Sequence, residues 1–175
     1  MMKKWLLVGT SVLMLLILVL VGHGVSNEQA GLGSEPPVLI VHCGENSVKA
    51  LRGTYSWSYV QNGQGVGVAA DSVHPLEAKD SMSPLAVVRD DDSAVVHLEF
   101  EVVPDSVSAC AWDTALWNKT DVEAQAVDVA VDDEQTLTLL PYDAVYSVTA
   151  TWDQENGCGG TAYYSFYTDS ATTEQ

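Results

Sequence analysis

The sequence predicts an all-β protein: an antiparallel β-sandwich preceded by one hydrophobic helix at the N-terminus. Apolar and polar residues alternate with period two over most of the chain beyond Pro37, as they do in strands that bury one face. Turn residues separate eight or nine such short segments, a spacing typical of a sandwich or a barrel. One long apolar run, at residues 5–22, lies apart from this pattern.

The apolar run has the features of an export signal. Lys3 and Lys4 precede it, and a basic start followed by an apolar stretch directs a chain across a membrane. The run is close to the lower length limit for spanning a bilayer and longer than a usual signal core. We therefore expect residues 1–25 to be a membrane anchor or a cleaved signal segment, with the anchor favoured. In either case the rest of the chain lies outside the cell, as a single-pass membrane protein or a secreted one.

The remainder divides into three parts. Residues 26–36 are polar, small and glycine-containing, which is typical of a flexible linker. Residues 37–168 form the predicted β-sandwich domain, a usual size for one domain. Residues 169–175 are expected to be a frayed tail.

The strands of the domain follow from alternation and turn signals. Asn62 and Gly63 predict a hairpin turn between the second and third strands, because Asn-Gly tolerates positive φ. Two prolines mark residues 71–84 as a loop. The expected strands are residues 38–42, 54–60, 65–70, 94–103, 107–112, 122–131, 136–140, 145–153 and 161–168.

Three strands show their buried face clearly. Tyr55, Trp57 and Tyr59 share one face of the strand 54–60. In the strand 94–103 the apolar residues are expected inside and His97 and Glu99 outside. In the strand 145–153 one face carries four apolar residues, which are Tyr146, Val148, Ala150 and Trp152.

One stretch resembles a known corner. In residues 139–150 two leucines, a turn and then Tyr-x-Val-x-Ala resemble the corner before the penultimate strand of immunoglobulin-like and fibronectin-type domains. The resemblance implies that the Tyr146 hydroxyl ties the corner to upstream backbone. Trp112 similarly resembles the core tryptophan of such sandwiches. An eight-stranded barrel is the main alternative and differs in lacking free sheet edges.

A second resemblance is to exported proteins of Gram-positive bacteria that have a short N-terminal anchor and one small β domain. The matching segments are residues 51–57 (LRGTYSW), 70–76 (ADSVHPL) and 161–166 (TAYYSF). This group has no established activity. The resemblance therefore implies the architecture and supplies no catalytic residues.

The charge of the chain excludes one class of partner. Against 7 basic residues there are 24 acidic ones, for a net charge of -17, and no acidic residue precedes Glu28. Binding to nucleic acid through a basic patch needs Lys and Arg, so no nucleic-acid partner is expected. Docking on anionic lipid by charge is disfavoured for the same reason.

Cys43, Cys110 and Cys158 all follow the apolar run, in a compartment where disulfides form. Three single pairings are open, and the odd count leaves one cysteine over. We favour Cys110 with Cys158, because in a sandwich their strands would be neighbours in one sheet. The alternative is that all three are reduced and buried.

No motif of a hydrolase or a nucleotide-binding enzyme is present, so no enzymatic activity is expected. Asp71 and His74 in the loop 71–84 are candidates to share a proton or bind a ligand, although they could equally cap the turn. Trp117 is a third candidate, because with Tyr163 or Tyr167 it could form an aromatic surface for a peptide or a sugar.

Two acidic clusters at predicted turns are candidate Ca²⁺ ligands, because Ca²⁺ takes six to eight oxygens. Solvated turns are the simpler interpretation, and no other cofactor is expected. The clusters are Asp90, Asp91 and Asp92, and Asp132, Asp133 and Glu134.

Together these observations predict a non-enzymatic extracellular module, held at the membrane by its N-terminal segment, that binds a protein or cell-envelope ligand. The alternative is an inhibitor or sensor of an extracellular hydrolase or receptor that acts through the loop 71–84.

Overall fold

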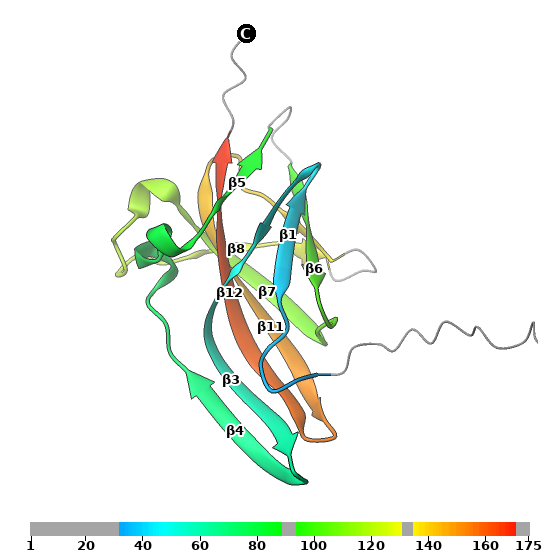
Figure 1. Ribbon diagram of the computed structural model, residues 1–175. Helices are drawn as coiled ribbons and strands as arrows, with labels where there is room; N and C mark the ends of the chain where they lie inside the picture. Colours follow the sequence, from blue (N-terminus) through cyan, green and yellow to red (C-terminus); the bar gives the residue numbers. More distant parts are fainter. Residues whose placement is uncertain (1–31, 89–93, 131–134, 171–175) are drawn as a thin grey trace, which may run out of the picture.

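The computed structural model describes residues 32–88, 94–130 and 135–170 (Figure 1). The protein is all-β, with two packed sheets whose strand orders are β2-β1-β6-β10-β9 and β4-β3-β12-β11-β7-β8. Every pairing is antiparallel except that of β5, which runs parallel to the end of β12. The coarse prediction of an all-β, two-sheet fold is confirmed.

The element bounds are as follows. The five-stranded sheet holds β1 (Leu39–Cys43), β2 (Asn46–Lys49), β6 (Val95–Phe100), β9 (Val129–Ala130) and β10 (Thr136–Thr138). The seven-stranded sheet holds β3 (Leu51–Gln61), β4 (Gln64–Ala70), β5 (Pro84–Val87), β7 (Ser106–Asp113), β8 (Gln125–Val127), β11 (Ala144–Glu155) and β12 (Cys158–Ser170). Three short 3₁₀ helices in the described residues are η1 (Pro75–Glu77), η2 (Lys79–Ser81) and η3 (Thr114–Leu116).

The main core lies between the two sheets and is centred on aromatic rings. Phe100 of β6 meets Trp152 of β11 and Tyr164 of β12 edge-on, at centroid distances of 5.7 and 5.8 Å. Trp57 of β3 meets Trp152 in the same way at 5.5 Å. Edge-to-face pairs are the favoured arrangement of aromatic rings, so this cluster ties β6 of one sheet to three strands of the other.

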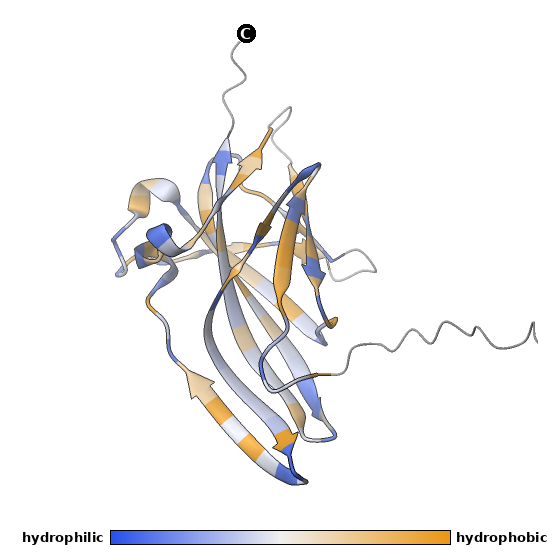
Figure 2. Ribbon diagram, viewed as in Figure 1, coloured by the Kyte–Doolittle hydropathy of each residue, from blue (hydrophilic) through white to orange (hydrophobic). Residues whose placement is uncertain are grey.

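The predicted alternation is confirmed in β6, which contributes Phe100 to this core. Burial along β6 alternates strictly, with Val96, Leu98 and Phe100 inside. Figure 2 shows the resulting apolar and polar bands along the strands. The turn at Asn62 and Gly63 is also confirmed: Gln61 pairs with Gln64, and the two turn residues have φ of 53° and 76°.

Two strands, β2 and β5, were not predicted. β5 lies at the end of the segment expected to be a loop, and only Leu85 and Val87 of its four residues are buried. A run of four residues with a proline at its start carries too little alternation to be recognised. Its pairing with Tyr167–Ser170 of β12 is a long-range contact that local sequence does not encode.

Trp112 does not have the predicted place. It is buried, with 9 % of its surface exposed, but it belongs to a small cluster with Leu76 and Val145 that is separate from the inter-sheet core. Side chains alternate along β7, and Ala111 is the residue that faces the other sheet. Trp57 and Trp152 fill the core instead.

Described residues on both sides of 37–168 also contact the domain. Residues 32–36 of the expected linker pack on the domain: Trp57 donates its indole N–H to the Gly33 carbonyl, and Arg52 donates to the Pro36 carbonyl. At the other end β12 continues through Asp169 and Ser170. The hydrophobic segment 1–25 lies outside the described residues. Within 32–88, 94–130 and 135–170, no helix has the length and hydropathy needed to cross a bilayer.

Candidate functional site

The segment 71–84 is fastened to the outer face of the seven-stranded sheet. His74 begins η1, and its Nδ1 accepts the backbone N–H of Leu76 at 3.1 Å. Leu76 is fully buried against Trp112 and Val145, and its carbonyl accepts the N–H of Asn118. The loop predicted from its prolines is therefore an ordered layer over the sheet.

A second short helix positions Trp117 beside this layer. Asp113 caps η3, with its carboxylate accepting the N–H of Ala115 at 2.7 Å. Thr114 donates both its N–H and its hydroxyl to the carbonyl of Asp143, each at 3.1 Å. These bonds anchor η3 to the start of β11 and fix the position of Trp117 directly after the helix.

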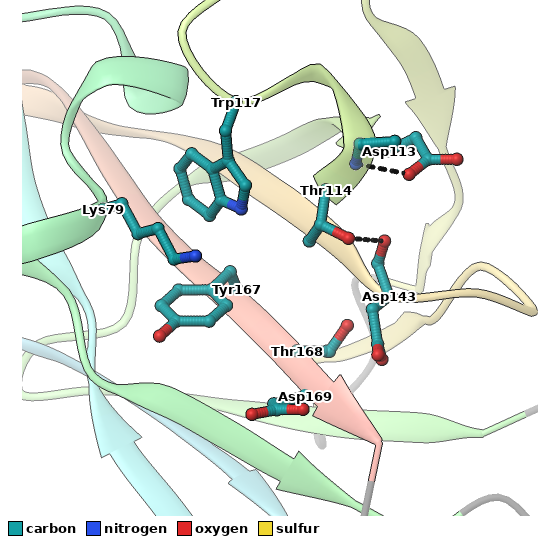
Figure 3. A pocket seen from close by; sticks show the side chains of 9 residues that line it. Lys79, Asp113, Thr114, Trp117, Asp143, Tyr167, Thr168 and Asp169 are labelled. Carbon is teal, nitrogen blue, oxygen red and sulfur yellow. Dashed lines mark hydrogen bonds between the residues drawn. The ribbon is translucent and has the colours of Figure 1, made fainter.

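Trp117 and Tyr167 form one wall of an open pocket of about 440 Å³ (Figure 3). Their rings meet at 88° with 5.4 Å between centroids. Lys79 of η2 extends toward them, and its ammonium lies 5.5 Å from the centroid of the Trp117 ring. We call this the aromatic pocket; its lining residues are Lys79, Asp113, Thr114, Ala115, Trp117, Asp143, Tyr167, Thr168 and Asp169.

The rim of the aromatic pocket is rich in hydrogen-bond acceptors. Three of its lining residues are aspartates and one is a lysine, so their formal charge is negative. One oxygen of Asp143 accepts the N–H and the hydroxyl of Ser170, at 3.0 and 2.6 Å, while Asp169 is exposed. Aromatic faces beside carboxylates can hold a ligand that has both an apolar body and hydrogen-bond donors or positive charge.

The structure brings together only some of the predicted candidates. Trp117 lies with Tyr167 in the aromatic pocket, whereas Tyr163 lines two other hollows on the same sheet. Asp71 lines one of those hollows and His74 the other. In the segment 71–84 no hydrogen bond joins Asp71 to His74.

His74 is used structurally. Because its Nδ1 accepts a backbone N–H, the neutral imidazole carries its proton on Nε2. Its ring also meets Trp112 edge-on at 5.0 Å. A histidine held in this way is a helix cap, the alternative that the sequence left open, and Asp71 does not orient it as a general base.

The expected disulfide between Cys110 and Cys158 is not formed, and both are thiols. Their strands share a sheet and flank β11, but Cys110 pairs with Ser147 of β11 while Cys158 pairs with Glu155. That offset of eight residues corresponds to about 26 Å along a strand, and bridged cysteines need Cα atoms within about 7 Å. Burial raises the pKa of the Cys110 thiol.

The two acidic clusters, Asp90 to Asp92 and Asp132 to Glu134, lie outside the described residues, so the Ca²⁺ hypothesis stays a prediction. Across the residues that the structure describes, no group of three or more His, Cys, Asp or Glu side chains is arranged to hold a metal ion.

Sequence reasoning missed most of the aromatic pocket. The pairing of β7 with β11 brings Asp113 and Asp143 together, and the docking of residues 71–84 on the sheet adds Lys79. A local signal exists for one of them, since Asp113 before a short apolar turn is typical of a helix cap. A cross-strand contact was missed too: His42 bonds to Glu99 at 2.7 Å on the outer face of the five-stranded sheet.

No family model, no curated protein and no solved structure matches this chain.

Proposed function

We propose that this chain is a non-enzymatic binding module with an immunoglobulin-like β-sandwich, displayed outside the cell by residues 1–25. Its ligand is a protein or cell-envelope component that presents a cationic group to the aromatic pocket. We also propose that the chain is of the same kind as the exported proteins of Gram-positive bacteria that its sequence resembles.

The strand order supports the immunoglobulin-like part of the proposal. The order β1-β6-β10-β9 corresponds to strands A-B-E-D of such domains, and β12-β11-β7 corresponds to G-F-C. The Tyr146 hydroxyl accepts the Leu140 N–H at the start of β11, the position of strand F. In this correspondence the β3–β4 hairpin is an insertion between strands A and B.

The contact between Lys79 and Trp117 is the observation that carries the choice of ligand. The indole face already attracts an ammonium group of the chain itself, at 5.5 Å. The three aspartates of the lining favour a positively charged ligand, as does the net charge of -17. A ligand lysine or arginine that displaced Lys79 would find both the ring and the carboxylates in place.

The test is calorimetric titration of the full chain with a short arginine- and lysine-containing peptide, with its glutamate-substituted counterpart, and with a neutral oligosaccharide. We expect binding of the basic peptide only, weakening as salt rises. Trp117→Ala should abolish binding. Tyr163→Ala, which removes an exposed aromatic ring outside the aromatic pocket, should leave it unchanged. Equal binding of the acidic peptide, or loss with the Tyr163 variant alone, would refute the proposal.

A second candidate, an inhibitor or sensor acting through residues 71–84, is favoured by one observation. The segment is held by Leu76 and His74 yet displays exposed residues, among them Val73 at 61 %. A loop rigid before binding loses little entropy on binding. Stoichiometric inhibition of an extracellular hydrolase that Val73→Asp relieves would support this role.

A further inference from the structure

β4 forms one edge of the seven-stranded sheet. β3 pairs with it along all seven residues, from Gln64 to Ala70. In the part of the chain that the structure describes, no strand pairs with its other side. Figure 1 shows β3 running beside β12, with β4 outermost at this side of the sheet. A free edge of this kind presents unpaired N–H and C=O groups.

β4 lacks the features that usually prevent edge strands from pairing. Its sequence, QGVGVAA, has no charged residue and no proline. Its register with β3 has no bulge. Proteins commonly protect free edges with lysine, proline or bulges. The chain has 24 acidic residues, yet none of them lies in β4, so no charge prevents this edge from pairing with another strand.

The hairpin geometry determines which amides face outward. In a two-residue hairpin the residues that close the turn, here Gln61 and Gln64, form a hydrogen-bonded pair, and hydrogen-bonded and non-hydrogen-bonded pairs then alternate. Gly65, Gly67 and Ala69 fall in the non-hydrogen-bonded pairs. Their backbone N–H and C=O groups therefore point to the free edge.

We propose that β4 pairs antiparallel with β4 of a second copy of this chain, about a two-fold axis at Gly67. In this register Gly67 faces Gly67 of the second copy, and Gly65 faces its Ala69. All three are outward-facing residues, so each can form a hydrogen-bonded pair across the axis. The strand is thus complementary to itself, as a two-fold interface requires.

The side chains fit the same register. Val66 faces Val68 of the second copy in a non-hydrogen-bonded pair, where side chains approach most closely. Both valines are half-buried, on the face where they pair with Tyr59 and Trp57 of β3. The pairing places four valines on one face as two cross-strand pairs and extends the apolar face of both hairpins across the axis.

Charge does not oppose this contact. The nearest acidic residue in sequence, Asp71, directly follows β4 and in this register faces Gly63 of the second copy. The two Asp71 residues are then eight positions apart, or about 26 Å. This is well beyond the screening length of about 8 Å at physiological ionic strength.

The dimer leaves both aromatic pockets open. β3 pairs with the segment of β12 between Gly159 and Ser165, whereas the pocket is built on residues 167–169 at the other end of the strand. Two pockets on one assembly would let a multivalent ligand bind with avidity. The dimer does not depend on the proposed ligand.

The test measures the mass of the full chain in a nonionic detergent by size exclusion with light scattering, over a range of concentrations. A Cβ at Gly67 meets no atom within 4 Å, so Gly67→Lys and Gly67→Glu keep the fold. Each places like charges opposite each other on the axis. We expect a dimer for the wild type and about a two- to fivefold higher dissociation constant for each variant. Ser108→Lys, an exposed strand position four strands away, is the control and should dimerise normally.

Mixing the two variants gives the decisive result. A Lys at position 67 lies opposite a Glu only if the axis passes through this residue, so an equimolar mixture should regain the dimer. A wild-type chain that stays monomeric overturns the proposal. In that case an extended peptide of another protein would be the partner that pairs with β4. A dimer that Gly67→Lys does not weaken, or a mixture that stays monomeric, overturns it as well.

Discussion

The backbone N–H of Leu140 donates a hydrogen bond of 2.9 Å to the hydroxyl of Tyr146, in a buried position. The Tyr146 ring stacks on Phe166 at 4.9 Å and 9°. The ring therefore holds the core while its hydroxyl fixes the corner that leads into β11.

Tyr146→Phe keeps the stacked ring and removes the hydrogen bond. We expect a loss of about 1 kcal/mol in the free energy of unfolding, the usual net value of one hydrogen bond. Urea denaturation measures it. Tyr142→Phe is the matched control, because that hydroxyl bonds to Gln125 on the surface. If both variants lower the free energy of unfolding by the same amount, the buried bond at the corner contributes no more to stability than the surface bond of Tyr142.

Leu76→Ala tests whether residues 71–84 are anchored by one side chain. Leu76 is fully buried, so truncation should cost about 2–5 kcal/mol and release the segment from the sheet. Hydrogen exchange should then rise across residues 71–84. Val73→Ala in the same segment, at a residue 61 % exposed, should stay within about 0.5 kcal/mol of the wild type. Unchanged exchange in the Leu76 variant would contradict this role.

Tyr164 gives the protein a dependence on alkaline pH. Burial raises the pKa of its phenol above the ordinary 10.0, and the charge of Arg52 only partly offsets this. The unfolded chain therefore loses this proton at lower pH than the folded chain. Stability from this group is fully present below about pH 10 and declines as pH rises through the raised pKa.

The measurement is the urea midpoint of the wild type and of Tyr164→Phe across this alkaline range. The variant loses the bond from the hydroxyl to the Pro37 carbonyl, so it starts less stable. Its midpoint should then fall less steeply with pH. Parallel curves would show that Tyr164 is not the group responsible.

Lys79→Gln should strengthen binding of a basic peptide to the aromatic pocket. The change removes the ammonium that lies over Trp117 and leaves the carboxylates unopposed. Because exposed cation–π contacts are worth about 0.5–1 kcal/mol, we expect roughly a two- to fivefold gain in affinity. Calorimetry measures it, with Lys49→Gln on β2 as a charge-matched control. Weaker binding would mean that Lys79 contacts the ligand itself.

Short-range patterns determined much of this fold. Period-two alternation placed Tyr146, Val148, Ala150 and Trp152 on one face of β11, and all four lie in the core. Asn62 and Gly63 specified their hairpin, because few other dipeptides accept two positive φ angles. Such features depend on neighbours in sequence, so the sequence alone was sufficient for them.

The tertiary structure decided what depends on long-range pairing. Trp112 is an apolar residue on a strand, but only the docking of Leu76 over β7 shows which face buries it. The register of β11 separates Cys110 from Cys158, although their strands lie in one sheet. Lys79 and Tyr167 meet in one pocket across 88 positions of sequence. Alternation specifies that a side chain is buried; the pairing of distant strands specifies its neighbours.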